Sequence, residues 1–185
     1  MNPKGKGAQE TEGNFASAWI NHGLAPKNAS YQYVIYPFNN EDEIKSFGEK
    51  VKTDNSYNIL KANETAHIVH DKTTNTTGYV IFEADKNLEN GIIKSVSKPA
   101  LIMAKKDDDN STTLSIVQPD LNFEPKGSNR FINFSRPVKF TITLDGKWST
   151  TLSESVLSVD HVSKGTVISL ELKDGLSHEI TLMKK

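Results

Sequence analysis

Residues 167–183 read VISLELKDGLSHEITLM and carry the clearest secondary-structure pattern in the chain. Apolar and polar residues alternate along VISLEL and again along HEITLM, which is typical of strands with one buried face. Asp174 and Gly175 stand between the two runs, and an Asp-Gly pair in that place favours a tight hairpin turn. The stretch therefore predicts two antiparallel strands, Thr166–Lys173 and His178–Met183, joined as a β-hairpin.

Similar short alternating runs continue back along the chain to residue 57. Turn-forming pairs such as Asn90-Gly91 and Asp145-Gly146 separate them. Many short strands at regular spacing are typical of an all-β protein, so we predict an antiparallel β-sandwich over residues 57–185. The further strands expected are Tyr57–Ala62, Ala66–Asp71, Gly78–Ala84, Ile92–Val96, Ala100–Lys105, Thr112–Gln118, Val138–Leu144 and Ser155–Val159.

One segment, residues 40–53, has the pattern of a helix. Ile44, Phe47 and Val51 recur at the spacing that places them on one helical face. Asn40 is suited to cap the N-terminus, and acidic residues crowd the first turn, where they oppose the helix dipole. We expect this helix to bridge two β units.

The composition excludes several classes of protein. The net charge of the 185 residues is −1, whereas a nucleic-acid-binding protein usually presents a strongly basic face. No run approaches the roughly 18 apolar residues of a membrane-spanning helix. The absence of cysteine excludes disulfides, zinc–thiolate sites and thiol nucleophiles, and we expect neither a cofactor nor a metal. Residues 1–14 are polar and Gly-rich, and are expected to form a flexible lead-in rather than a secretory signal.

Residues 15–37 read FASAWINHGLAPKNASYQYVIYP, and two strand-like runs there predict another hairpin. The stretch resembles the signature W-x-x-H-G-x-x-P-x-x-A-x-Y-x-Y-x-x-x-P of polysaccharide lyases of family eight. Residues 57–84 and 98–122 resemble the C-terminal domain of that family. VKFTITLDGKW, residues 138–148, is similar to a segment of its bacterial chondroitin sulfate ABC lyase branch. The residues that match the signature are Trp19, His22, Gly23, Pro26, Ala29, Tyr31, Tyr33 and Pro37.

The resemblance implies a role without catalysis for this chain. Enzymes of the family cleave chondroitin, dermatan, hyaluronan or xanthan by elimination, with catalytic groups on an α/α-toroid of many helices. This chain offers one helical segment, so no catalytic residue can be assigned, and we expect the chain alone to be inactive. The signature residues are then structural, and residues 15–38 form the last strands of a central lyase β-sandwich.

The same resemblance implies partners and a compartment. The partners are the rest of the parent lyase, namely its catalytic α/α-toroid and central β-sandwich, and a glycosaminoglycan polysaccharide. The compartment is extracellular or periplasmic. A free-standing carbohydrate-binding β-sandwich module is the alternative function.

Residues 126–139 suggest a surface for a polyanionic substrate. Cations recur there without an intervening acid, and Phe131 and Phe134 lie among them. Trp148 follows the Asp145-Gly146 turn and has the type of side chain that stacks on a sugar ring. The alternatives are an ordinary loop with solvated cations and a tryptophan of the core. The candidate substrate-binding residues are Lys126, Arg130, Arg136, Lys139 and Trp148.

Other polar groups have structural explanations. His22 with its neighbouring tyrosines is expected to fix a turn rather than to act as an acid–base pair. His67 and His70 are three residues apart in one strand, so they face opposite sides of the sheet and cannot chelate one metal. The run DDDN at residues 107–110 lacks the ligand spacing of a calcium loop and is expected to be a solvated hairpin tip.

Overall fold

The computed structural model describes residues 13, 17, 19–28, 31–35, 37, 40–53, 56–121, 136–163 and 165–185. The chain divides into two compact units, Met1–Glu41 and Asp42–Lys185, which are described separately. Residues 1–12 and 14 of the predicted flexible lead-in lie outside the described residues, and so do residues 126–135 of the cationic stretch.

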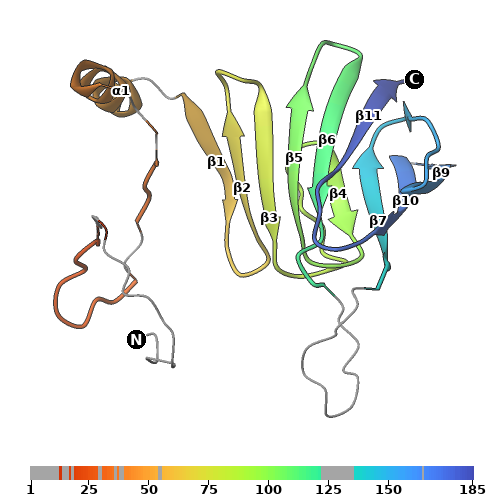
Figure 1. Cartoon of the computed structure of the whole chain (residues 1–185), viewed down its shortest axis with the longest axis horizontal. Coiled ribbons are helices and arrows are strands. Elements are labelled where there is room, and N and C mark those ends of the chain that lie inside the picture. The colour runs from red at the N-terminus through yellow and green to blue at the C-terminus, as the bar shows by residue number, and fades with distance from the viewer. Residues whose placement is uncertain are drawn as a thin grey trace. The chain divides into compact units, whose positions relative to one another are not determined.

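Helix α1 spans Glu41–Thr53, which confirms the helix expected at this place (Figure 1). Its apolar face is only partly covered, since Ile44 is exposed while Phe47 and Val51 are half-buried. The last turn is closed by two local contacts, because Lys52 pairs with Glu49 at 2.9 Å and the Thr53 hydroxyl donates to the Glu49 carbonyl at 2.7 Å. That α1 bridges two β units stays a prediction.

The larger sheet contains seven antiparallel strands (Figure 1). Neighbouring registers are regular; for example, Ile68 lies opposite Tyr79, and Tyr79 opposite Ile102. In spatial order the strands are β1 (Tyr57–Ala62), β2 (Ala66–Asp71), β3 (Thr76–Ile81), β5 (Ala100–Lys106), β6 (Ser111–Val117), β11 (His178–Lys184) and β8 (Trp148–Ser149).

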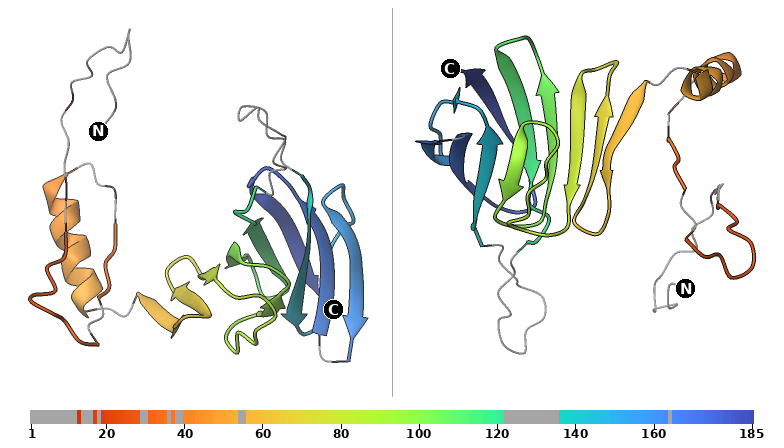
Figure 2. Two further views of the ribbon diagram at one scale, coloured as in Figure 1. Left: turned by 90° about the horizontal axis from the view of Figure 1, so that it is seen from below. Right: turned by 180° about the vertical axis from the view of Figure 1, so that it is seen from behind.

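The smaller sheet has four antiparallel strands and packs against the larger one (Figure 2). Alternate residues of both sheets point into one apolar core, which contains Ile68 and Leu114 from the larger sheet and Phe140 and Leu170 from the smaller. The predicted β-sandwich is therefore confirmed. In spatial order the strands of the smaller sheet are β4 (Ile93–Val96), β7 (Val138–Asp145), β10 (Gly165–Leu172) and β9 (Val156–Val162).

The hairpin predicted for residues 167–183 is wrong, although both of its strands exist. β10 pairs with β7 and β9, whereas β11 pairs with β6 and β8 in the other sheet. Asp174 and Gly175 both have positive φ, 61° and 63°, and turn the chain from one layer of the sandwich to the other. Alternation shows that a strand has one buried face, but it does not show which strand lies beside it.

The hairpin predicted within residues 15–38 does not form among the described residues of that segment. Residues 19–28 and 31–35 contain no β-ladder. A two-stranded hairpin without further strands or a packing layer is marginal in water, which explains why alternation alone is not enough here. The boundaries predicted for residues 15–38, 40–53 and 57–185 as separate parts of a lyase stay predictions.

Candidate functional site

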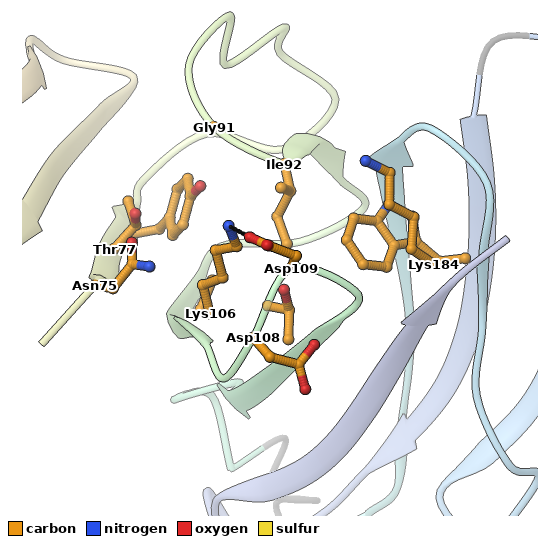
Figure 3. Close-up of a pocket in the computed structure, with 12 residues that line it drawn as sticks. Asn75, Thr77, Gly91, Ile92, Lys106, Asp108, Asp109 and Lys184 are labelled. Carbon is orange, nitrogen blue, oxygen red and sulfur yellow. Dashed lines mark hydrogen bonds and ion pairs between the residues drawn. The ribbon is translucent and has the colours of Figure 1, made fainter.

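A hollow of about 310 Å³ lies at one end of the larger sheet, beside the loop before β4 (Figure 3). β3 and the loop before β4 supply one wall, and β8 and β11 supply another. The β5–β6 hairpin contributes most of the charged groups. The lining residues that determine the chemistry of the hollow are Tyr79, Ile92, Lys106, Asp109, Trp148 and Lys184.

Tyr79 places an aromatic ring and a buried hydroxyl on the wall of the hollow. The residue is 2% exposed, and its hydroxyl makes no hydrogen bond of good geometry within the described part of the chain, although the backbone of Ile92 and Ile93 and the side chain of Thr77 lie near it. Burial raises the pKa of Tyr79 to about 12, against smaller opposing effects from the backbone of Ile93 and Ile92 and the side chain of Thr77. The phenol is therefore neutral at physiological pH. Gly91 lies directly over this hydroxyl, so a side chain there would collide with it.

Trp148 forms part of the core and also contributes to the lining. It is 8% exposed, its indole N–H donates to the Asp145 carbonyl at 2.6 Å, and its backbone N–H donates to the Thr166 hydroxyl at 2.8 Å. These bonds hold the indole in one orientation. The candidate role of Trp148 in substrate binding stays a prediction, and the residue is mostly covered by the sandwich.

The charges around the hollow are balanced. Lys106 pairs with Asp109 at 2.7 Å, and Lys106 beside Asp109 holds the pKa of that carboxyl below its usual value. Asp108 accepts hydrogen bonds from the backbone N–H groups of Asn110 and Ser111 at 2.7 and 2.8 Å, and interactions with Ser111 and Asn110 lower its pKa. With Lys184, the lining carries two ammonium groups and two carboxylates.

These contacts explain the acidic run 107–110 as a hairpin tip. Asp107 accepts from the Thr113 hydroxyl at 2.7 Å, so each carboxylate of the run is bonded to a nearby group of its own hairpin. Across the part of the chain that the structure describes, no group of three or more His, Cys, Asp or Glu side chains is arranged to hold a metal ion.

The candidate cationic residues do not gather at the hollow. Lys126 and Arg130 lie outside the described residues, whereas Arg136 and Lys139 are exposed where β7 begins. Asp145, at the other end of β7, is roughly 20 Å of extended chain from Lys139. Trp148 follows three residues after Asp145. Substrate binding by these residues stays a prediction.

His22, His67 and His70 occupy separate environments. His67 meets Phe82 edge-on at 5.1 Å between ring centroids, and His70 contacts the Thr77 hydroxyl at 3.0 Å. His22 lies 5.0 Å from the ring of Tyr31, which stacks on Tyr33 at 6.0 Å. That these histidines have structural roles stays a prediction.

Three of the signature residues, His22, Tyr31 and Tyr33, form a local aromatic group. Trp19 is 81% exposed, and Tyr31 and Tyr33 are exposed as well. Gly23 has φ of 75°, and its N–H donates to the Asn21 side chain at 2.8 Å, which shapes the connecting turn. Ala29 lies outside the described residues, and the structural role predicted for the signature stays a prediction.

Comparison with known proteins identifies the class of domain that this sandwich represents. Residues 58–122 match the family model described as the C-terminal β-sandwich domain of polysaccharide lyase family 8. The chain is 31% identical over 183 residues to the chondroitin sulfate ABC endolyase of Proteus vulgaris, which covers 98% of this chain and 17% of that protein. It is 30% identical over 196 residues to the chondroitin sulfate ABC exolyase of Bacteroides thetaiotaomicron, covering 95% of this chain and 19% of that one.

The fold and the matched segment define a lyase-type C-terminal β-sandwich. The chain belongs to polysaccharide lyase family 8, as its sequence predicted. It spans less than a fifth of the length of these two relatives. A solved chondroitin AC lyase from Streptomyces coelicolor A3 aligns with 76% of this chain and 17% of its own, at 13% identity and a TM-score of 0.47. Within the described residues, no helix is long and apolar enough to span a membrane.

Proposed function

We propose that this chain is a non-catalytic C-terminal β portion of a glycosaminoglycan lyase that cleaves chondroitin or dermatan sulfate by β-elimination. The observation that carries the proposal is the identity of about 30% with two chondroitin sulfate ABC lyases along nearly the whole chain. A lyase acting on this polysaccharide works outside the cytoplasm, in the extracellular space or periplasm.

The surface that would carry out the supporting role of the sandwich is the outward face of the larger sheet. Large apolar side chains are exposed there in neighbouring strands: Val69 lies beside Ile59, and Val80 beside Leu101. Met103, opposite Gly78, is 58% exposed. We call this surface the apolar face; it consists of Ile59, Val69, Val80, Phe82, Leu101 and Met103.

Contiguous exposed apolar surface is typical of a protein interface. The occupant that we propose is the rest of a lyase, since the two relatives are more than five times as long as this chain. The sandwich then contributes a rigid surface on which the catalytic part is held.

Two assays test the proposal. Incubation of the purified chain with chondroitin sulfate should produce no ultraviolet absorbance of unsaturated uronate, and a rate proportional to chain concentration would overturn the non-catalytic assignment. In a chimera, this chain replaces the matching part of the Proteus vulgaris endolyase. We expect lyase activity to be retained, and to fall together with thermal stability on the Val80→Lys, Met103→Lys double substitution.

The matched control is Thr181→Lys, which adds a charge to an exposed position of β11 in the same sheet, away from the apolar face. If both charged chimeras keep full activity and stability, the apolar face is not the supporting interface. If the unsubstituted chimera folds but is inactive, the assignment to the chondroitin lyase branch fails.

The second candidate function is a free-standing carbohydrate-binding module, which the hollow beside Trp148 favours. Retention on immobilised chondroitin sulfate at low salt, lost on the Arg130→Ala, Arg136→Ala double substitution, would support the cationic stretch as its binding surface. Retention unchanged by these substitutions would remove that stretch from the binding surface.

A further inference from the structure

We propose that the hollow at the end of the sandwich is a binding site for one uncharged sugar ring, a hexose or an N-acetylhexosamine. The proposal goes beyond the supporting role, and it rests on the proposed function only for the source of the sugar, a polysaccharide chain. It assigns to this domain a ligand distinct from the polyanion expected at the cationic stretch.

The size of the hollow selects a small ligand. Its volume of about 310 Å³ is at the lower end of the roughly 300–1,000 Å³ that ligand pockets occupy. A single pyranose ring therefore fits, whereas several consecutive sugars would extend beyond it.

The walls combine apolar surface with hydrogen-bonding groups in the way that a sugar requires. The apolar part of the lining against which the C–H face of a pyranose would lie comes from the half-buried side chain of Ile92 and the small exposed part of Trp148, while Tyr79 lies behind them almost fully buried. Figure 3 shows Asn75 and Thr77 on one side of the hollow and Lys184 on the opposite side, with the Lys106–Asp109 pair between them. Donors and acceptors thus stand on opposite sides of the space where hydroxyl groups would lie.

The balance of charge argues for an uncharged ligand. Asp109 is already paired with Lys106, and Lys184 further lowers the pKa of the same carboxyl. A sulfate or uronate entering the hollow would therefore meet two carboxylates as well as two ammonium groups. Hydroxyl groups, by contrast, can donate to the carboxylates and accept from the ammonium groups without a net charge.

The Tyr79 hydroxyl is an independent indication of a ligand. Buried polar side-chain atoms in folded proteins nearly always have a hydrogen-bond partner, and this one has none of good geometry among the described residues, only the nearby backbone of Ile92 and Ile93 and the side chain of Thr77. It belongs to the wall of the hollow, beneath Gly91. A sugar hydroxyl that reaches past the backbone of Gly91, or a water that the sugar holds there, would supply a partner of better geometry.

Titration of the isotope-labelled chain followed by NMR tests the site, with N-acetylgalactosamine and glucose as probes. We expect saturable amide shifts at Gly91, Ile92, Thr112 and Lys184 with a Kd of about 1–10 mM, the range for one small polar ligand. Lys184→Ala should weaken binding at least fivefold. The control is Lys105→Ala, whose side chain lies on the outward face of β5.

Thr112→Val is a second variant that removes a hydroxyl from the lining with little change of shape. Unchanged thermal unfolding of each variant shows that lost binding is not lost folding. Absence of shifts with both probes at about 100 mM overturns the proposal. Tighter, salt-dependent binding of a sulfated disaccharide at the same amides overturns the uncharged-ligand assignment. Neither result affects the chimera assay, so the site and the lyase assignment fail separately.

Discussion

At the scale of single residues, Thr166 links the two layers of the sandwich. Its side chain is fully buried in β10, accepts the backbone N–H of Trp148 and donates to the Gly146 carbonyl at 3.0 Å. One hydroxyl thus satisfies two backbone groups of the turn that carries the chain from β7 to β8. A threonine is suited to the position because its branched shape also fits a strand.

Thr166→Val should therefore destabilise the protein although it preserves the shape of the side chain. The substitution leaves the Trp148 N–H and the Gly146 carbonyl without their partner, and a buried unpaired polar group costs about 1–3 kcal/mol. Urea denaturation measures the change in the free energy of unfolding. Thr143→Val, at a half-buried position of β7, is the control and should change stability by less than about 0.5 kcal/mol. Equal effects of the two substitutions would contradict the bridging role of Thr166.

Gly165 is constrained in another way, because the backbone of β7 approaches it too closely for a side chain to fit. A Cβ atom at this buried position would collide with the carbonyl oxygen of Leu144 in the neighbouring strand. Gly165→Ala should lower the free energy of unfolding by about 1–3 kcal/mol, because β7 and β10 must separate to admit the methyl group. Gly78→Ala is the control, since its Cβ would meet only the Val69 carbonyl oxygen at 4.0 Å. Thermal unfolding compares them, and a Gly165→Ala protein as stable as Gly78→Ala would refute the clash.

At the scale of elements, two hairpin tips are each stabilised by an aspartate that accepts hydrogen bonds from the residues that follow it. Asp71 accepts from the Thr73 N–H and from the Thr73 and Thr74 hydroxyls, and these bonds, the Thr73 side chain foremost, lower its pKa. Asp108 has the corresponding role in the β5–β6 hairpin. The two tips are neighbours, since the Lys106 N–H donates to the Asn75 carbonyl at 3.1 Å.

The lowered pKa of Asp108 predicts a particular pH dependence. A carboxyl whose pKa is lower in the folded state stabilises the fold above its ordinary value of 3.8, and this contribution disappears as pH falls through the folded value. Asp108→Asn should therefore be less stable than the unsubstituted chain at neutral pH, with a difference that vanishes in acid below 3.8. Urea midpoints measured across this range provide the test. A difference that is independent of pH would show that the charge of Asp108 plays no part.

The strands illustrate what the sequence can predict and what it cannot. The strand at Val138–Leu144 is recognisable because its apolar residues alternate strictly and all face one core. β8, by contrast, has two residues, too few for any periodicity. The neighbours of β10 and β11 also escape prediction, because either strand buries its apolar face equally well from either side of the core.

The hollow shows the same limit for a site. Trp148 can be singled out from its type and its place after a turn, but Tyr79 in β3 reads as an ordinary buried strand residue. Lys106 and Lys184 are alternating polar residues at strand ends with no local signal. These groups come together only because β3, β5, β8 and β11 share one sheet, and that order is a property of the fold.

At the scale of the whole molecule, the exposed apolar face determines whether the isolated chain associates with itself. The core-facing residues of the larger sheet are covered by the smaller sheet, whereas Val80, Leu101 and Met103 stay exposed on the other side. In the proposed lyase this face is covered by the remaining protein. Water contact with such a surface is unfavourable, at about 25 cal/mol per Å² of apolar area.

The isolated chain should therefore associate with itself as its concentration rises. Sedimentation velocity should show a weight-average mass that increases with concentration, and the Val80→Lys, Met103→Lys double variant should stay monomeric because buried ammonium groups are costly. Thr181→Lys, which leaves the apolar face intact, should associate like the unsubstituted chain. Monomeric behaviour of the unsubstituted chain at all concentrations would show that the exposed side chains are too dispersed to drive association, and would weaken the case that this face holds another part of the lyase.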